Sequence, residues 1–201
     1  MIVEMFPQYS DEWWAARNGI PTASVFSKIV TSTGKKAASW NAEAFHLAAE
    51  IEMGHHAETF TNEAMERGIA LEAEARDAYQ FITGNEVDEV GLIFKDAHRA
   101  WSCSPDGMGE GGLEIKCPLP HTQKEYQYRG KLPTKYAPQV WGSLWVADEL
   151  PYWDFFSYHP EMKPFCVRVT RDDDGYRRYA DALETYMPQF VDFVAEIVDK
   201  C

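Results

Sequence analysis

The chain has 201 residues, of which 45% are hydrophobic and 14% aromatic, and this composition predicts one globular domain over residues 1–201 while excluding a disordered protein. The formal net charge of −13 excludes indiscriminate binding to nucleic acid, because each phosphate contact needs a local cation, but it permits a confined basic channel. No apolar run approaches the roughly 20 residues that span a bilayer. We therefore expect a cytoplasmic protein without membrane association, whose four scattered cysteines are reduced thiols.

Helical signals dominate the first half of the chain. Ser10 is a candidate N-cap for a helix over residues 10–18, and a second helix is expected to begin near Thr22 or Ser24. A polar loop over 31–41 precedes two helices, at 41–53 and from residue 61 or 62 to 83. The second of these carries an apolar stripe with Glu72 at its edge, formed by Gly68, Leu71, Ala75, Ala78 and Ile82.

The second half begins with alternating residues that favour strands. Strands are expected at 86–96, 100–107 and 112–118, followed by a helix within 135–148 that begins near Thr134 or Pro138. Two further strands, at 151–160 and 164–171, precede a terminal helix that Pro188 should kink or divide. The predicted class is α/β (α+β), with a central mixed β-sheet flanked by helices.

Three formal charges gather in the segment SCSPDGMGEGGLEIKCP, residues 102–118. Because side chains alternate along a strand, Glu114 and Lys116 share one face, and Asp106 across the turn could approach Glu114 on that face. Two carboxylates and an amine suit metal-assisted hydrolysis of a phosphodiester, since Mg²⁺ prefers oxygen ligands. A hairpin with one face in water would show the same pattern, so spacing alone leaves both interpretations open. A third carboxylate from Glu72, packed toward the sheet, would complete an acidic site; the alternative is an ordinary solvated glutamate on a helix.

The segment between His121 and Ala147 is locally basic. It mixes cations with aromatic rings, as nucleic-acid-binding surfaces do, although a solvated helix or loop has the same composition. Its members are Lys124, Tyr126, Tyr128, Arg129, Lys131, Lys135 and Tyr136.

Together these residues resemble a known family. An acidic helix residue, P-D at a strand end, E-x-K in the next strand and a later helix with Gln139 resemble the restriction-endonuclease-like nuclease superfamily, and more narrowly the phage lambda exonuclease family. The matching segments occur in order over most of the chain: RNGIPTAS (17–24), GIALEAEARDAYQFITG (68–84), SCSPDGM (102–108), GLEIKCP (112–118), PQVWGSLWV (138–146) and YHPEMK (158–163).

The resemblance implies a restriction-endonuclease-like core and a processive 5′-to-3′ exonuclease. Such an enzyme degrades one strand of duplex DNA to 5′-mononucleotides and leaves 3′ single-stranded tails for recombination by strand annealing. By carry-over, Asp106, Glu114 and the Ile115 carbonyl bind Mg²⁺, Glu72 assists the metal and water network, and Lys116 positions or deprotonates the water. Two Mg²⁺ ions per site are implied, with Mn²⁺ as an expected substitute.

The family also implies a pocket for the 5′-terminal phosphate, here Arg17, Ser24, Ser104 and Gln139. A surface ion pair, a helix cap and a backbone hydrogen bond are the structural alternatives for Arg17, Ser24 and Gln139. A side chain that splits the duplex end corresponds to Trp40, with Lys35 and Lys36 holding the DNA backbone; an ordinary loop anchor is the alternative for Trp40.

The implied partners are double-stranded DNA ends, two further copies of the chain in a homotrimeric ring, and a single-strand annealing protein. The implied setting is a bacterial host cell, with a phage or prophage gene. The alternatives are a structure-specific endonuclease of the same superfamily, an inactive DNA-end-binding module, and an iron–sulfur nuclease, which the scattered cysteines disfavour. We expect His55 and His56 to face solvent rather than bind zinc.

Overall fold

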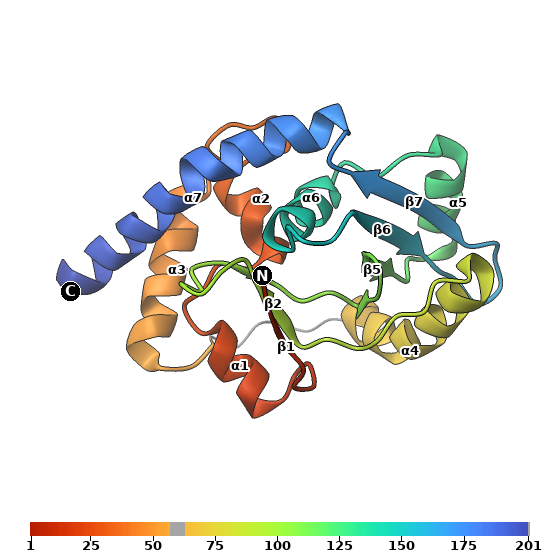
Figure 1. The fold of residues 1–201 in the computed structure, drawn as a ribbon, viewed down its shortest axis with the longest axis horizontal. Coiled ribbons are helices and arrows are strands. Elements are labelled where there is room, and N and C mark those ends of the chain that lie inside the picture. The colour runs from red at the N-terminus through yellow and green to blue at the C-terminus, as the bar shows by residue number, and fades with distance from the viewer. Residues whose placement is uncertain (57–62, 201) are drawn as a thin grey trace.

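The computed structural model describes residues 1–56 and 63–200, which form a mixed α/β structure with two small sheets (Figure 1). The elements in chain order are β1 (Ile2–Glu4), α1 (Asp11–Arg17), the 3-10 turn η1 (Ala23–Val25), α2 (Phe26–Ile29), α3 (Trp40–Met53), α4 (Glu63–Thr83), β2 (Leu92–Phe94), β3 (Ser102–Cys103), β4 (Gly107–Met108), β5 (Gly112–Lys116), α5 (Pro120–Arg129), α6 (Ala137–Val146), β6 (Tyr152–Ser157), β7 (Phe165–Thr170) and α7 (Asp174–Lys200).

The strands form two sheets rather than the single central sheet expected. One has the order β1-β2-β3; the other has the order β4-β5-β6-β7 and is mixed, because β5 and β6 are parallel while its other pairs are antiparallel. The strand expected over 100–107 is divided into β3 and β4, which belong to different sheets. Pro105 lies at this division, where it has no N–H to donate to a ladder.

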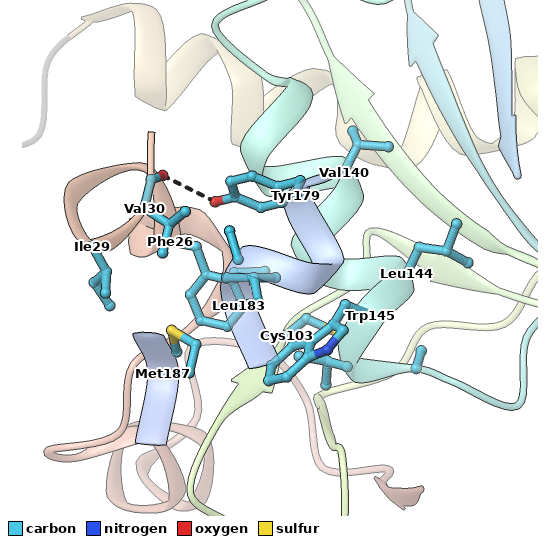
Figure 2. Close-up of a cluster of buried hydrophobic side chains, with 14 of the residues drawn as sticks. Phe26, Ile29, Val30, Cys103, Val140, Leu144, Trp145, Tyr179, Leu183 and Met187 are labelled. Atoms are coloured by element: carbon cyan, nitrogen blue, oxygen red, sulfur yellow. Dashed lines mark hydrogen bonds between the residues drawn. The ribbon is translucent and has the colours of Figure 1, made fainter. Parts of the chain in front are cut away.

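A helix, α6, occupies the centre of the main core. Val140, Leu144 and Trp145 of α6 belong to one buried cluster with residues of α2 and α7 (Figure 2). Beside this cluster the Tyr179 hydroxyl donates to the Val30 carbonyl at 3.3 Å. Gly142 permits this close packing, since a Cβ there would lie 2.5 Å from the Phe26 ring. In Figure 1, α3 and α7 lie side by side beyond this core, at the end of the molecule away from the four-stranded sheet.

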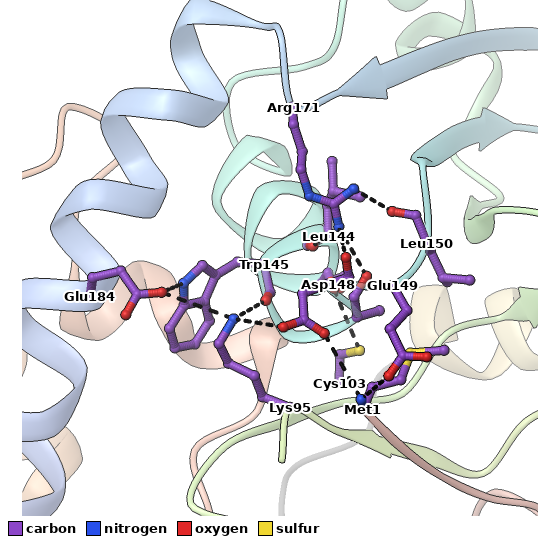
Figure 3. A network of polar contacts seen from close by, with 12 residues as sticks. Met1, Lys95, Cys103, Leu144, Trp145, Asp148, Glu149, Leu150, Arg171 and Glu184 are labelled. Carbon is purple, nitrogen blue, oxygen red and sulfur yellow. Dashed lines mark hydrogen bonds and ion pairs between the residues drawn. The ribbon is translucent and has the colours of Figure 1, made fainter.

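The C-terminal end of α6 is held by a polar network (Figure 3). Arg171, which follows β7, donates to the carbonyls of Leu144 and Ala147 at 3.2 Å and of Asp148 at 2.8 Å. Lys95 donates to the Trp145 carbonyl at 2.7 Å. Cations at a helix C-terminus satisfy its last carbonyls and complement its dipole, so this network sets the position of α6.

The opposite face of the four-stranded sheet is covered by α4. Ala75 and Tyr79 pack with Leu113 and Ile115 of β5, whereas Ile82, expected in the apolar stripe, is 54% exposed. The predicted end of this helix at Gly84 is confirmed, with φ +73° there; its predicted start at residue 61 or 62 lies outside the described residues.

A buried carboxylate fixes α4 against the sheet. Asp154 of β6 is 1% exposed; it accepts from the Tyr79 hydroxyl at 2.7 Å and from Arg168 of β7 at 2.9 and 2.8 Å. The Arg168 guanidinium also lies over the Tyr152 ring, 3.4 Å from its centroid. A buried charge is tolerated only with such partners, so this network fixes the rotation of α4 about its axis.

The terminal helix is not divided at Pro188. This residue lies inside the continuous α7, and Met187 and Phe190 near it are fully buried in the same core. None of the helices within residues 1–56 and 63–200 combines the length and the apolar character that crossing a lipid bilayer requires.

The sequence patterns did not predict two of the elements, β1 and α5. The strand β1 has only three residues and is held by β2. The polar helix α5 lacks an apolar stripe, although Pro120 in its first turn and Gly130 at its C-cap, with φ +60°, were usable end signals.

We expect Asp154→Ala to lower the free energy of unfolding by about 2 kcal/mol, because the buried Tyr79 hydroxyl loses its acceptor. Urea denaturation measures this change. Asp154→Asn keeps an acceptor and should cost less; equal losses in both variants would contradict the role assigned to the hydrogen bond.

Candidate functional site

The hairpin of β4 and β5 brings two carboxylates together. Its register pairs Gly107 with Leu113, so continuing by one residue sets Asp106 opposite Glu114 on one face of the sheet. The Asp106 N–H donates to the Leu113 carbonyl at 3.0 Å, and Asp106 Oδ2 accepts from the Ile115 N–H at 2.6 Å. Backbone hydrogen bonds on both sides of Asp106 thus fix its carboxylate beside β5.

Glu114 and Lys116 form an ion pair on that face. Glu114 is 1% exposed; its Oε1 contacts Lys116 Nζ, and its Oε2 has no hydrogen-bond partner within the described residues. Burial raises the pKa of Glu114 to about 7, with Asp106 adding to the rise and Lys116 opposing it. Burial lowers the pKa of Lys116, but Glu114 and Asp106 outweigh it and the net pKa is raised, so Lys116 is an ammonium.

A third acid comes from α4. Burial raises the pKa of Glu72 to about 7, and Asp106 adds to the rise, while Arg76 and Lys116 oppose it. Burial raises the pKa of Asp106 as well, against the effects of Lys116, the Ile115 N–H and Arg76. These mutual influences show that Glu72, Asp106, Glu114 and Lys116 form one electrostatic cluster.

Arg76 is a member of this cluster that the sequence patterns do not single out. It donates to Glu72 at 2.8 Å and to the Asp106 carbonyl at 2.7 Å, and it also pairs with Glu89. An arginine four residues after a glutamate on one helix is a common surface pair. Only the fold shows that this one joins α4 to the Pro105–Asp106 turn.

A cavity of about 290 Å³ opens beside the acids. Its walls come from α4, the Pro105–Asp106 turn and the N-terminal segment 5–9, with Glu72, Arg76 and Asp106 among the lining residues. Gln8 ties the N-terminal wall in place, since its side-chain amide donates to the carbonyls of Val90 at 3.0 Å and Pro105 at 2.7 Å.

The oxygen groups of the cluster fit a hard cation. Within residues 1–56 and 63–200, no group of three or more His, Cys, Asp or Glu side chains is arranged to hold a metal ion. Mg²⁺ does not need such a group, because it is usually bound by one or two carboxylates, water and substrate phosphate. The unpartnered Glu114 Oε2 and the facing Asp106 carboxylate offer that donor set. Cys103, Cys117 and Cys166 are free thiols.

Arg17 and Ser24 meet through Thr22. Arg17 Nη2 donates to Thr22 Oγ1 at 3.5 Å, and Thr22 Oγ1 lies 2.7 Å from Ser24 Oγ. Burial lowers the pKa of Arg17 to about 10, and its Nε has no hydrogen-bond partner in the part of the chain that the structure describes. The guanidinium is held over the Trp13 ring, 3.9 Å from the centroid. A half-buried guanidinium with a free N–H among the described residues is suited to an anionic ligand.

Ser104 and Gln139 are the remaining candidates for the phosphate pocket. Ser104 Oγ is buried and lacks a partner among the described residues, and β3 just before it is bridged to Thr22 through Ser102. Gln139 is half-buried on α6, one turn after Tyr136, whose ring centroid lies 5.4 Å from Lys116 Nζ. The structure links Arg17, Thr22 and Ser24 by direct contacts; for Gln139 it gives only this position on the helix.

Trp40 begins α3 and belongs to the core. It is 3% exposed, and its ring packs edge-on against Tyr186 and Phe190 of α7. A buried ring at this position agrees with an anchor for the preceding loop. It does not agree with a side chain that is exposed to split the end of a DNA duplex. Lys35 and Lys36 are exposed, and Lys36 Nζ lies 4.1 Å from the Trp40 ring centroid.

His56 corrects another expectation. It is not fully solvent-facing, because its ring stacks on Trp14 with centroids 4.8 Å apart and Nδ1 lies 2.5 Å from the buried Glu50 carboxylate. His55 is exposed, as expected.

The residues of the basic segment between His121 and Ala147 differ in exposure. Its cations Lys124, Arg129, Lys131 and Lys135 are exposed, and Arg129 pairs with Glu125 at 2.7 Å. Tyr126 is buried, whereas Tyr128 is 91% exposed. Tyr126 therefore serves the core, and only the outer residues can meet a ligand.

The chain is similar to one known protein family and to several solved structures. The model of the YqaJ-like viral recombinase domain matches residues 12–149. The crystal structure of an alkaline exonuclease (LHK-Exo) from Laribacter hongkongensis is similar, with 31% identity, coverage of 95% of this chain and 97% of that chain, and a TM-score of 0.79. The same values hold for LHK-Exo in complex with dAMP. A phage-related exonuclease from Haemophilus somnus 129PT shares the fold, with 16% identity, coverage of 86% and 95%, and a TM-score of 0.57. No curated protein matched the chain.

The pKa values of Glu72 and Glu114 predict a pH-dependent response to Mg²⁺. Both rise from the ordinary 4.5 to about 7, so the folded state holds protons that the unfolded chain releases, and their contribution to the free energy of unfolding falls as pH rises from 4.5 to about 7. Mg²⁺ competes with these protons.

We therefore expect Mg²⁺ to raise Tm more at pH 8 than at pH 5.5, measured by differential scanning calorimetry. Asp106→Asn, which removes one ligand charge, is the control and should show a smaller shift at pH 8. An equal Mg²⁺ shift at both pH values would contradict binding at these acids.

Proposed function

The chain belongs to the YqaJ-like viral recombinase family, and on this premise we propose that it is a Mg²⁺-dependent exonuclease acting on linear double-stranded DNA. The observation that carries the proposal is the buried Glu114–Lys116 ion pair with Asp106 opposite, beside an open cavity. The 31% identity to an alkaline exonuclease over 95% of the chain supports it, as does the dAMP complex of that relative.

Asp106 and Glu114 would hold the metal through their carboxylates, together with the Ile115 carbonyl. When bound, Mg²⁺ supplies a Lewis acid that stabilises negative charge on the reacting phosphate. Two ions per site are part of the proposal, with Mn²⁺ as a substitute. Glu72 adds negative charge and a hydrogen-bond acceptor for water from the opposite wall, where Arg76 orients it at 2.8 Å.

Lys116 would position the attacking water. Its pKa is raised by Glu114 and Asp106, which supports an ammonium that donates hydrogen bonds rather than an amine that accepts a proton. The water oxygen forms a bond to phosphorus and releases a proton to solvent, the P–O3′ bond breaks, and the departing 3′ oxygen takes a proton from solvent. The product is a 5′-mononucleotide, and the shortened strand keeps a new 5′ phosphate.

Arg17, Ser24, Ser104 and Gln139 would bind the 5′-terminal phosphate and so set the 5′-to-3′ direction. Arg17 Nε and Ser104 Oγ, which have no hydrogen-bond partner among the described residues, support this role, because a phosphate would satisfy both groups. Cleavage regenerates a 5′ phosphate at the next nucleotide, which can re-enter the same pocket and make degradation processive. The other strand remains as a 3′ single-stranded tail.

The wider setting of the proposal is recombination in a bacterial host by strand annealing, with a phage or prophage gene. A homotrimeric ring would enclose the DNA and reconcile the net charge of −13 with DNA binding, since a basic interior can coexist with an acidic exterior. A single-strand annealing protein would load onto the 3′ tail.

Degradation of linear duplex DNA in Mg²⁺ tests this function. We expect loss of the strand with a 5′ phosphate, release of mononucleotides, and slower digestion of 5′-hydroxyl ends. Arg17→Lys keeps the charge but loses the guanidinium fork, so it should reduce the preference for the phosphate by about tenfold. Internal nicking would instead support an endonuclease, and binding without cleavage in any divalent metal would support an inactive end-binding module.

Lys116→Ala should slow the chemical step by about 10² to 10³, the usual cost of removing one preorganised hydrogen-bond donor. Single-turnover digestion of pre-bound DNA measures that step separately from binding. Lys131→Ala, which removes an exposed cation outside the cluster, is the matched control. A Lys116→Ala rate within a few-fold of wild type would exclude a catalytic role.

A further inference from the structure

Tyr9 has an unusual backbone for a large side chain. Its φ is +66°, in the left-handed region that glycine adopts freely but other residues rarely do. It is fixed there by its neighbours, because Gln8 is hydrogen-bonded to the carbonyls of Val90 and Pro105, and Ser10 caps α1 through Trp13 N–H. Strain of this kind persists where the surrounding structure maintains it, and it is a reason to look for a function.

The Tyr9 side chain lies between the two halves of the proposed site. It lines the 290 Å³ cavity with Glu72 and Asp106. Its ring centroid is 5.1 Å from that of Trp13, which carries the Arg17 guanidinium on its face. Burial raises the pKa of the Tyr9 hydroxyl, and Glu72 and Asp106 add to the rise, whereas Arg17 and Lys116 oppose it.

Exposure separates Tyr9 from the neighbouring aromatic residues. Trp13 is 3% exposed and its indole N–H is bonded to the Gly91 carbonyl at 2.8 Å, whereas Tyr9 is 52% exposed. Within residues 1–56 and 63–200, the Tyr9 hydroxyl has no hydrogen-bond partner. Tyr9 therefore presents an aromatic surface to solvent at the cavity, while the tryptophans serve packing and hold Arg17.

We propose that Tyr9 contacts the 5′-terminal nucleoside of the DNA, stacking its ring on the base while the terminal phosphate lies at Arg17 and the scissile phosphate at Asp106 and Glu114. This inference rests on the proposed function and deepens it. One nucleotide links the two phosphates, so its base and sugar must pass the residue between the two phosphate sites. A ring stacked on a base makes binding sensitive to the presence of that base and tolerant of its identity.

A packing role is the competing explanation. Tyr9 directly precedes the N-cap Ser10, and its ring centroid lies 6.3 Å from that of Trp14, as in a hydrophobic staple. A staple would affect stability alone. It would not make DNA affinity depend on a base at the 5′ end, and that difference separates the two roles.

The test compares two 5′-phosphorylated duplexes that differ only at the 5′-terminal nucleotide, which carries a base in one and a tetrahydrofuran abasic analogue in the other. Dissociation constants are measured by fluorescence anisotropy in Ca²⁺, which permits binding without requiring turnover. We expect the wild type to bind the complete end about tenfold more tightly, a ratio within the range for one base stacked on an aromatic ring.

Tyr9→Gly should bring this ratio close to one, whereas Tyr9→Phe keeps the ring and should retain it. Glycine adopts φ +66° without strain, so the variant should fold, and calorimetry checks that it does. Phe81→Ala, which removes another exposed aromatic side chain from the end of α4, is the matched control and should behave as wild type. An unchanged ratio in folded Tyr9→Gly would overturn the inference.

The proposed function is tested separately by Mg²⁺-dependent digestion and by the Arg17→Lys comparison of 5′-phosphate with 5′-hydroxyl ends. If wild type digests DNA with that phosphate preference but shows no preference for a terminal base, only the role of Tyr9 is overturned. If it binds complete ends preferentially but does not cleave in Mg²⁺, the exonuclease function fails while the Tyr9 contact stands.

Discussion

The burial of the Glu114 carboxylate is the constraint on which the site depends. A carboxylate that is 1% exposed must be neutralised, and Lys116 supplies the opposite charge from the same strand face. The N–H of Ile115 holds Asp106 across the hairpin at 2.6 Å, so the two acids lie close together. Burial raises the pKa of both, and Asp106 adds to the rise at Glu114. Burial thus holds two carboxyl groups and one ammonium together in a single site on the hairpin.

The two faces of the four-stranded sheet are covered by different helices, and each helix positions different residues of the site. On one face, α6 places Tyr136 near Lys116, and Arg171 fixes the far end of that helix. On the other, Asp154 holds Tyr79 and thereby sets the rotation of α4, which carries Glu72 and Arg76 toward Asp106. The site is therefore built on regular elements, whose side chains are restrained by packing and by buried hydrogen bonds.

The N-terminal segment connects the acidic cluster to the Arg17 region. Gln8 bonds to Pro105, directly before Asp106, and Ser10 begins the helix that ends at Arg17. A displacement of residues 7–10 would therefore affect both halves of the proposed site together. This coupling is a physical reason for the strained backbone at Tyr9, since the chain has little freedom between those two attachments.

By itself the sequence determined the local features: the helix caps at Ser10 and Gly84, the alternation of Glu114 and Lys116 with apolar residues, and a family resemblance that the comparisons confirmed. These follow from backbone preferences and periodicity, which act over a few residues. Only the tertiary structure decided that β3 and β4 belong to different sheets, that Trp40 is buried, and that Arg76 and Tyr9 border the acids. Each of these depends on contacts between segments far apart in the chain, where packing and electrostatics outweigh local propensity.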